Sequence, residues 1–456
     1  MIARRFGFCI CLLAWLLCLP GCEVGPDYVK PDMDLPENWT QYTVPATAAS
    51  IKEWWKSLND PVLDKLVEKA LANNQDRQVA EARIREARAG RLTAAAKLYP
   101  QIGSDVQAAH GQPGALTFNE TFDIYQPQLD ATFEIDLFGG NRRAVEAQDA
   151  VIEARQAAYQ DFSLSLIAEV ASEYTTYREL QLRKSLTDET VETQKALYDL
   201  NEIRMKAGLA SQLDTSQAET LYRTTEAQAP LIDRQLAETG FRLTLLLGEN
   251  PGAEDAELKE TKPVPAFTAL PALSAPESII EQRPDVKVAE RTLAANTALQ
   301  GVAISELYPK ITLSGLFGLQ NTNLFPEVET YEVAGDFALP ILNFGSIQGQ
   351  VDAADARQIE AFHAYKQSVL GALADVETHM SDLAKEQRRQ DDLEKVVKSS
   401  ERTYKLARSR YDSGLAPFLD VLDAQERLYN NQIELAATTG NATRYAIALS
   451  KALGVY

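Results

Sequence analysis

Acidic residues that recur at a fixed distance are the side chains of this 456-residue chain whose type and spacing could do chemistry. Asp214 and Asp420 end two copies of one pattern, an arginine followed by Gly-Leu-Ala and then by Leu-Asp, and the copies lie 206 residues apart. Asp423 follows Asp420 by three residues, so on a helix the two carboxylates share a face. Carboxylates gathered around a narrow passage repel one another and attract cations. A single carboxylate in the first turn of a helix has a simpler role, because the helix dipole stabilises it.

The sequence shows none of the side-chain patterns that catalysis requires. The three histidines, His110, His363 and His379, are far apart, and the last two are expected on the solvated face of a long helix. No nucleophile elbow, phosphate-binding loop or metal-ligand spacing occurs. We therefore predict that the chain is not an enzyme, and that it has no metal site and no cofactor. Its formal charge of −20 argues against a nucleic-acid partner.

The N-terminus carries a targeting segment, which we place at residues 1–21. Arg4 and Arg5 precede an apolar run that is too short to span a bilayer and has the layout of a signal peptide. The run ends in Leu-Pro-Gly-Cys22, which resembles the lipobox of bacterial lipoproteins, so we predict a covalent lipid, including palmitate, on Cys22. The alternative is an ordinary secretory signal in which Cys22 is incidental. Cys22 would be the only cysteine of the mature chain, so no internal disulfide can form.

Two further patterns recur and divide the chain into related halves. Leu98-Tyr99-Pro100 returns as Leu307-Tyr308-Pro309 after 209 residues, and Phe138-Gly139 returns as Phe344-Gly345 after 206 residues. Because insertions belong in loops, the change of offset predicts a loop between these two patterns. Three patterns in the same order predict two structural repeats.

Strands are predicted after each Tyr-Pro pair, where the sequence changes from helical character to alternation with period two. One face of the clearest strand in each half is apolar, with Leu129, Ala131, Phe133, Ile135 and Leu137 in the first half and Tyr331, Val333, Phe337, Leu339 and Ile341 in the second. Strands of about 9 to 11 residues can cross an outer membrane. Four strands cannot close a membrane barrel, so several chains would have to share one. The same alternation also fits a soluble sheet that packs on a core.

Long helices are predicted where proline is absent. The ranges 140–206 and 345–412 each cover nearly 70 residues, or roughly 100 Å, which suits helices that pack side by side as a wall. Each range ends at Gly-Leu-Ala, where Gly208 and Gly414 are expected to cap the helix in a left-handed conformation. A returning helix then makes each of these places the tip of a helical hairpin.

These motifs occur together with Val24-Gly25-Pro26-Asp27-Tyr28, Trp54-Trp55 and Arg283-Pro284-Asp285, and on them the chain resembles the TolC-like outer-membrane factors. The resemblance covers essentially the whole mature sequence and favours the lipoprotein branch called NodT-like or OprM-like. It implies a mainly α fold with a membrane β-barrel, in which long helical hairpins form a trimeric periplasmic tunnel and four strands per chain give a twelve-stranded barrel. The implied function is the exit channel of a tripartite efflux system, which passes small molecules from an inner-membrane pump and a periplasmic adaptor to the exterior. The implied location is the bacterial outer membrane, with a lipid anchor and an extension into the periplasm.

The same resemblance assigns roles to residues of the two tips. The gate of the pore would be formed by Asp214, Tyr411, Asp420 and Asp423. The adaptor would dock on Gly208, Leu209, Ala210, Ser211, Ser413, Gly414, Leu415 and Ala416. The family archetype has an arginine where this chain has Ala416, so the closed state must be held in another way. The phenol of Tyr411 could bond a neighbouring carboxylate, or the ring could simply pack.

The predicted organisation follows from these features. The chain would consist of a signal peptide at 1–21, a lipid-anchored extended segment at 22–60, a first repeat at 61–248, a Pro-rich connector at 249–276 and a second repeat at 277–456. Helices are expected at 61–98, 140–247, 277–307 and 345–453, and strands at about 101–138 and 310–342. Two other functions stay open, a lipid-anchored periplasmic scaffold or adhesin without a pore, and the exit duct of a type I protein secretion system.

Overall fold

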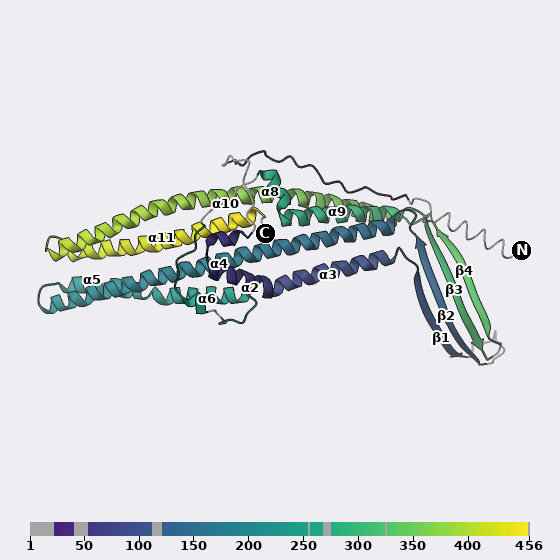
Figure 1. The fold of residues 1–456 in the computed structure, drawn as a ribbon, viewed down its shortest axis with the longest axis horizontal. Coiled ribbons are helices and arrows are strands. Elements are labelled where there is room, and N and C mark those ends of the chain that lie inside the picture. The colour runs from purple at the N-terminus through teal and green to yellow at the C-terminus, as the bar shows by residue number, and fades with distance from the viewer. Residues whose placement is uncertain are drawn as a thin grey trace. The chain divides into compact units, whose positions relative to one another are not determined.

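The computed structural model describes residues 22–40, 53–111, 121–253, 256–267, 275–323 and 326–454 (Figure 1). The predicted signal peptide lies outside these ranges. The chain forms two compact units, and each takes residues from both halves of the sequence. Within the described ranges, the first unit comprises residues 22–33, 82–156 and 288–367, and the second comprises residues 34–81, 157–287 and 368–454.

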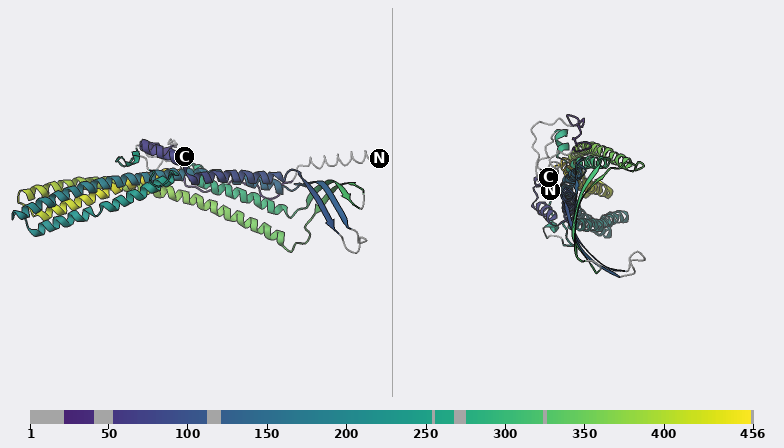
Figure 2. Two further views of the ribbon diagram at one scale, coloured as in Figure 1. Left: turned by 90° about the horizontal axis from the view of Figure 1, so that it is seen from below. Right: turned by 90° about the vertical axis from the view of Figure 1, so that its right-hand side faces the viewer.

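The first unit contains a four-stranded antiparallel sheet with the order β1-β2-β3-β4. Its strands are β1 (Gln101–Gly111), β2 (Phe122–Ile135), β3 (Lys310–Thr322) and β4 (Val328–Ala338), and they bend together (Figure 2). The two predicted hairpins are present, and β2 also pairs with β3, with Ile135 opposite Ile311. β4 ends at Ala338, before the predicted Ile341, because Pro340 has no N–H to donate to a ladder.

The long helices have matching lengths in the two halves. α4 (Gly140–Lys206) and α10 (Ser346–Asp412) each have 67 residues, and α3 (Gln75–Ala96) and α9 (Pro284–Ser305) each have 22. The predicted long helices are therefore confirmed to within one residue. In the ranges that the structure describes, no helix has the length and apolar composition of a membrane span.

The second unit contains the shorter helices and the largest apolar core. Its elements are the 3-10 helix η1 (Trp54–Leu58) and the helices α2 (Pro61–Asn73), α5 (Gln212–Glu226), α6 (Ala229–Leu246), α7 (Ala256–Lys259), α8 (Pro276–Gln282) and α11 (Phe418–Ala452). Trp54, Leu63, Ile167 and Leu243 are fully buried in one cluster, together with Leu258 from the Pro-rich connector. The buried guanidinium of Arg178 donates to the carbonyl oxygen of Leu258 at 3.0 Å, which attaches the connector to α4.

Two helices that the sequence predicted as continuous are divided, and so is the returning helix predicted after the first tip. The helix expected at 61–98 breaks at Asn74. The one expected at 277–307 breaks at Arg283, because a residue before a proline is disfavoured in helical conformation. The helical range 140–247 turns at the first tip, as predicted, and breaks again before α6, where Pro230 occupies the first turn. Both single-residue breaks are held by hydrogen bonds to the end of a returning helix. Asn74 Nδ2 donates to Leu246 O at 3.0 Å, and Arg283 Nη1 donates to Ala452 O at 2.8 Å.

Candidate functional site: the hairpin tips and the N-terminal cysteine

The first tip joins α4 to α5 through a left-handed glycine. Gly208 has φ 73°, and the Leu209 N–H donates to Arg204 O at 2.8 Å, which closes the end of α4. Ser211 then caps α5, since its Oγ accepts from the Asp214 N–H at 3.1 Å while Asp214 Oδ2 accepts from the Ser211 N–H at 3.2 Å. This reciprocal pair is a capping box. Within one protomer, Asp214 therefore caps the helix to which it belongs. Its role in the gate stays a prediction.

The second tip has the same backbone and a different cap. Gly414 has φ 71°, and the Leu415 N–H donates to Arg410 O at 2.8 Å. The N-cap of α11 is Pro417, which makes no side-chain hydrogen bond. Asp420 lies in the first turn and is exposed, and no side chain of the described residues pairs with its carboxylate. Asp423 is also exposed and accepts from Arg427 Nε at 3.1 Å.

Tyr411 packs between the two hairpins of the second unit. Its ring lies 5.1 Å from that of Phe418 and 5.2 Å from the guanidinium of Arg204. Its phenol donates to Asn201 Oδ1 at 3.2 Å, so within the protomer its partner is a buried amide and not the expected carboxylate. The sequence analysis missed Asn201. A polar residue on a helix face that is otherwise apolar, four residues after Leu197, was the signal that could have revealed it.

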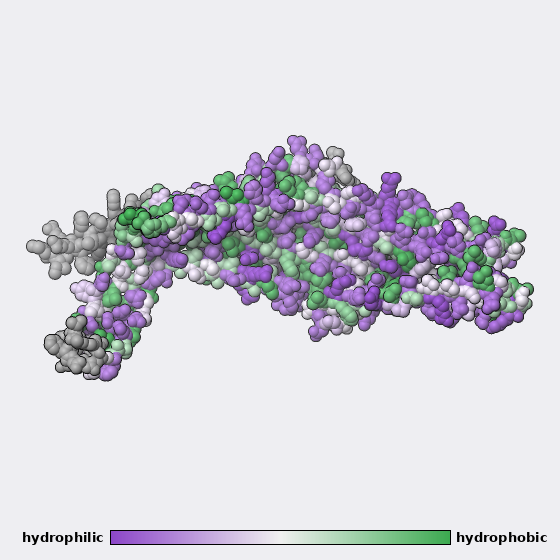
Figure 3. Space-filling view, turned by 180° about the vertical axis from the view of Figure 1, so that it is seen from behind, coloured by the Kyte–Doolittle hydropathy of each residue, from purple (hydrophilic) through white to green (hydrophobic). Residues whose placement is uncertain are grey.

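Exposed leucines occupy both tips, on a surface that is otherwise largely hydrophilic (Figure 3). Leu209 and Leu415 are 78% and 70% exposed, and Leu213 and Leu419 also face solvent. Ser211 and Ser413 are exposed, whereas Ala210 and Ala416 are half-buried. Apolar side chains that gather on an exposed surface mark a contact site for another protein.

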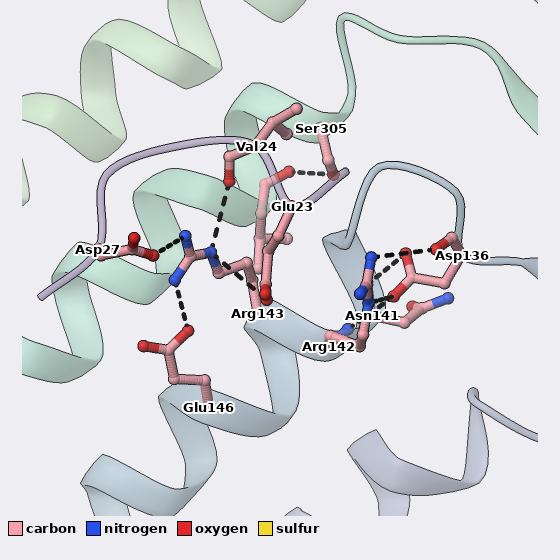
Figure 4. A network of polar contacts seen from close by, with 10 residues as sticks. Glu23, Val24, Asp27, Asp136, Asn141, Arg142, Arg143, Glu146 and Ser305 are labelled. Atoms are coloured by element: carbon pink, nitrogen blue, oxygen red, sulfur yellow. Dashed lines mark hydrogen bonds and ion pairs between the residues drawn. The ribbon is translucent and has the colours of Figure 1, made fainter. Parts of the chain in front are cut away.

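The N-terminal segment is held against α4 directly after the exposed Cys22. The Val24 N–H donates to Phe138 O at 3.1 Å, and the Arg143 guanidinium contacts Asp27 at 2.6 Å, Glu146 at 2.7 Å and Glu23 at 3.6 Å (Figure 4). The Arg143 side chain is only 4% exposed. Burial lowers its pKa, but the bonds to Glu146 and Asp27 outweigh burial and raise it. Arg143 was not among the residues predicted to form a site.

The two histidines of α10 differ in exposure. His363 is exposed, as expected, whereas His379 is half-buried, so the expectation of a solvated face was wrong for His379. Among the described residues, no three or more His, Cys, Asp and Glu side chains are grouped in a way that could hold a metal ion.

Comparisons with known proteins agree along the whole chain. The family described as "Outer membrane efflux protein" matches residues 66–249 and 275–455. Nodulation protein T of Rhizobium leguminosarum bv. trifolii is 30% identical over 445 residues, which are 96% of this chain and 95% of that protein. The pyoverdine export outer membrane protein OpmQ of Pseudomonas aeruginosa is 28% identical over 459 residues, which are 97% of this chain and 96% of that protein.

Solved structures show the same fold. The outer-membrane channel OprN superposes with a TM-score of 0.88 at 32% identity, covering 95% of this chain and 99% of that chain. The open state of the Neisseria gonorrhoeae MtrE outer membrane channel gives a TM-score of 0.86 at 25% identity, covering 95% of this chain and 98% of that chain.

Proposed function

This chain belongs to the outer membrane efflux protein family, and on that basis we propose that it is the exit channel of a tripartite efflux system. In this system it would pass small molecules from an inner-membrane pump and a periplasmic adaptor to the exterior. The observation that carries the proposal is the match along nearly the full length, in sequence to an efflux pump outer membrane protein and in fold to outer-membrane channels. A homotrimer, a docked adaptor and a lipid anchor are the finer parts of the proposal, and each has its own support and test.

The homotrimer is supported by the two edges of the sheet. β1 and β4 are edge strands, and nearly every residue of β1 is exposed. An unpaired strand edge is not tolerated in lipid. A second copy of the chain would pair its β1 with β4, and three copies would bring together the twelve strands that the family fold implies.

The internal repeat indicates which side chains would meet at this seam. Where β2 runs beside β3, the rings of Phe138 and Tyr308 stack with their centroids 4.6 Å apart. The repeat counterparts of these two residues are Phe344 and Tyr99, which are 93% and 67% exposed. Phe344 also has φ 50°, a left-handed conformation that is uncommon for residues other than glycine. We expect Phe344 of one protomer to stack on Tyr99 of the next.

Crosslinking tests the seam. The double variant Phe344→Cys, Tyr99→Cys in outer membranes should be joined by a short bismaleimide into a closed covalent trimer, because acylated Cys22 offers no thiol. The matched control is Phe138→Cys, Tyr308→Cys, which should link within one chain and leave its mass on a denaturing gel that of one protomer. The proposed seam would be contradicted if the control formed its crosslink within one chain while the test variant formed no crosslink between protomers.

The channel itself is tested by conductance. Reconstituted protein should conduct ions across a planar bilayer and prefer cations, because rings of Asp420 and Asp423 would place negative charge at the constriction. The double variant Asp420→Asn, Asp423→Asn should move the reversal potential in a salt gradient toward that of a non-selective pore. Anion preference in the unaltered protein would exclude the gate assignment, and the absence of conductance would favour the scaffold or adhesin.

Adaptor docking is supported by the exposed leucines of the tips. A photo-crosslinking residue at Ser211 or Ser413 should capture a periplasmic adaptor in cells, and mass spectrometry would identify it and hence the class of pump. Capture of a type I secretion adaptor would favour the alternative duct function. Failure at both tips, with the protein present in the outer membrane, would remove the docking proposal.

The lipid anchor is supported by the lipobox-like sequence Leu-Pro-Gly-Cys22 and by the exposure of Cys22. The intact mass of the purified protein should exceed that of the chain from Cys22 onward by a diacylglycerol group and one further acyl chain such as palmitoyl. Cys22→Ser should lack this added mass. A protein that starts at another residue and carries no lipid would show that the signal is an ordinary secretory one.

A further inference from the structure

The residues that follow Cys22 lie in a groove between the start of α4 and the end of α9. Glycines on both sides allow close backbone approach, namely Gly25 in the segment and Gly139 and Gly301 in the floor of the groove. A Cβ atom on Gly25 would lie 2.5 Å from Gly301 Cα, and a Cβ atom on Gly139 would lie 2.8 Å from Glu23 Cγ. A Cβ atom on Gly301 would lie 3.1 Å from Val24 O. A side chain at any of these positions would push the segment out of the groove.

Polar contacts hold the segment along its length. At its start, Val24 N–H donates to Phe138 O, and Arg143 Nε donates to Val24 O at 3.4 Å. Further along, Asp27 pairs with Arg143, and the Tyr28 hydroxyl donates to Glu290 Oε1 at 2.7 Å on α9. Arg291 lies over the Tyr28 ring at 5.3 Å. The segment is therefore bound by both helices through backbone and side chains.

The groove occurs at one of the two equivalent places in the repeat. The counterpart of Arg143 on α10 is Gly349, 206 residues later, and the counterpart of Gly301 on α3 is Leu92, 209 residues earlier. Glycine cannot supply the guanidinium, and leucine would fill the floor. The guanidinium of Arg143 and the open floor at Gly301 are thus confined to the α4–α9 pair, which lies next to the strand pair β2–β3.

We propose that this groove is a built seat for the chain's own N-terminus, with Arg143 as the positioning residue that holds acylated Cys22 beside the junction of β2 and α4. The proposal rests on the proposed lipid anchor for its biological role, but the seat itself begins at Glu23. Phe138, which receives the Val24 N–H, comes three residues after the end of β2. The acyl chains would therefore enter the membrane next to the strands, as a rigid part of the channel rather than as the end of a loose tether. The buried Arg143 makes the segment rigid, because a buried charge requires its carboxylate partners to stay in place.

Hydrogen exchange of the purified full-length protein in detergent tests the seat. In the unaltered protein, the Val24 amide should be protected. Arg143→Met should speed its exchange at least tenfold, and Gly301→Val should do the same by filling the floor. The matched control is Arg142→Met, because Arg142 is a neighbouring arginine whose guanidinium bonds Asp136 and not Asp27. Unchanged Val24 exchange in Arg143→Met, with exchange of the β2 amides also unchanged, would overturn the proposal.

Two further variants separate the seat from folding and from the lipid. If Arg143→Met fails to reach the outer membrane, Asp27→Asn removes the 2.6 Å ion pair from the segment side and leaves both helices intact. It should also speed Val24 exchange, and no change would count against the seat. Cys22→Ser should keep Val24 protected, whereas loss of protection would show that the lipid and not the groove holds the segment. A protected Val24 in a protein without acyl mass would leave the seat standing and remove only the lipid anchor.

Discussion

Asn74 and Arg283 occupy equivalent places in the two halves, and each reaches the carbonyl at the end of a returning helix. They lie 209 residues apart, and the carbonyls that they bond, those of Leu246 and Ala452, lie 206 residues apart. Both side chains are buried. The four last carbonyls of a helix have no partner within the helix, and a buried one needs a donor. The shared geometry therefore follows from a backbone requirement that both halves have to meet.

The chemistry of the two donors differs. Asn74 is neutral, and its Oδ1 also accepts from the Arg77 N–H at 3.0 Å at the start of α3. Arg283 is charged and forms ion pairs with Asp285 at 2.7 Å and with Asp375 at 3.2 Å. The difference shows that the place of the donor is constrained, while its charge is free to diverge as long as the new charge has partners. Variants of the two junctions should separate these contributions.

The largest effect is expected from Arg283→Met. This change leaves Ala452 O without its donor and leaves two carboxylates without a counter-charge. Removal of one partner of a buried pair costs about 3 to 5 kcal/mol. Because Asp375 is 56% exposed, we expect roughly 2 to 3 kcal/mol here, measured as the free energy of local opening from hydrogen exchange of the last turn of α11. A loss no larger than that of Asn74→Ala would show that the charge adds nothing.

Asn74→Ala should have a smaller effect at the matching place. It leaves Leu246 O unsatisfied and removes the cap of α3, and the loss is expected to be about 1 to 2 kcal/mol of local opening free energy at the end of α6. The α11 end should be unaffected, which makes each variant the control of the other. Equal losses at both helix ends from either variant would mean that the two junctions open together.

A smaller difference in opening free energy is expected between the two hairpin tips. Ser211→Ala removes one half of the capping box and should lower the opening free energy of the first turn of α5 by about 1 kcal/mol. Pro417 provides no side-chain hydrogen bond at the other tip. Pro417→Ala should therefore change the opening free energy of the first turn of α11 by no more than about 0.5 kcal/mol. Hydrogen exchange of the two turns in one experiment compares them directly. The reverse order would show that the cap is not what stabilises the first tip.

The smallest effect on stability is expected from a change of pH, and only where Arg283 meets the end of α11. Burial raises the pKa of Asp285, but the bonds from Arg283 outweigh it and hold this pKa below its ordinary value of 3.8. Asp285 therefore contributes stability that is present above about pH 4 and is lost as pH falls through its depressed pKa. Burial raises the pKa of Asp161 nearby, so its ionisation costs stability that is recovered as pH falls through the raised pKa.

Hydrogen exchange between pH 7 and pH 3 should show these two opposite contributions at the end of α11. The opening free energy there should rise slightly and then fall below about pH 4, whereas the end of α6 beside neutral Asn74 should show neither change. Asp161→Asn should remove the rise, and Asp285→Asn should remove the fall. A parallel decline at both helix ends would assign the pH dependence to the chain as a whole.

Local signals were enough to predict much of this protein. The left-handed glycines at 208 and 414, the ends of the 67-residue helices and the start of each strand after Tyr-Pro were all predicted from residues that are neighbours in the chain. Each of these features depends on backbone preferences or on periodicity over a few residues. The acidic first turns at both tips were also predicted, because a cap involves residues only three positions apart.

The sequence by itself thus determined the elements, the repeat and the family. Only the tertiary structure decided which residues that are far apart in the chain bond to each other. Arg143 meets Asp27 across 116 residues, and Tyr411 meets Asn201 across 210. It also decided that β2 pairs with β3, and that the helix predicted at 61–98 breaks at Asn74, whose side chain donates to a carbonyl at the end of α6. The break at Arg283, in contrast, has a local signal in Pro284. The physical reason is that a hydrogen bond or ion pair between distant residues depends on how whole helices pack, and no spacing along one segment encodes it.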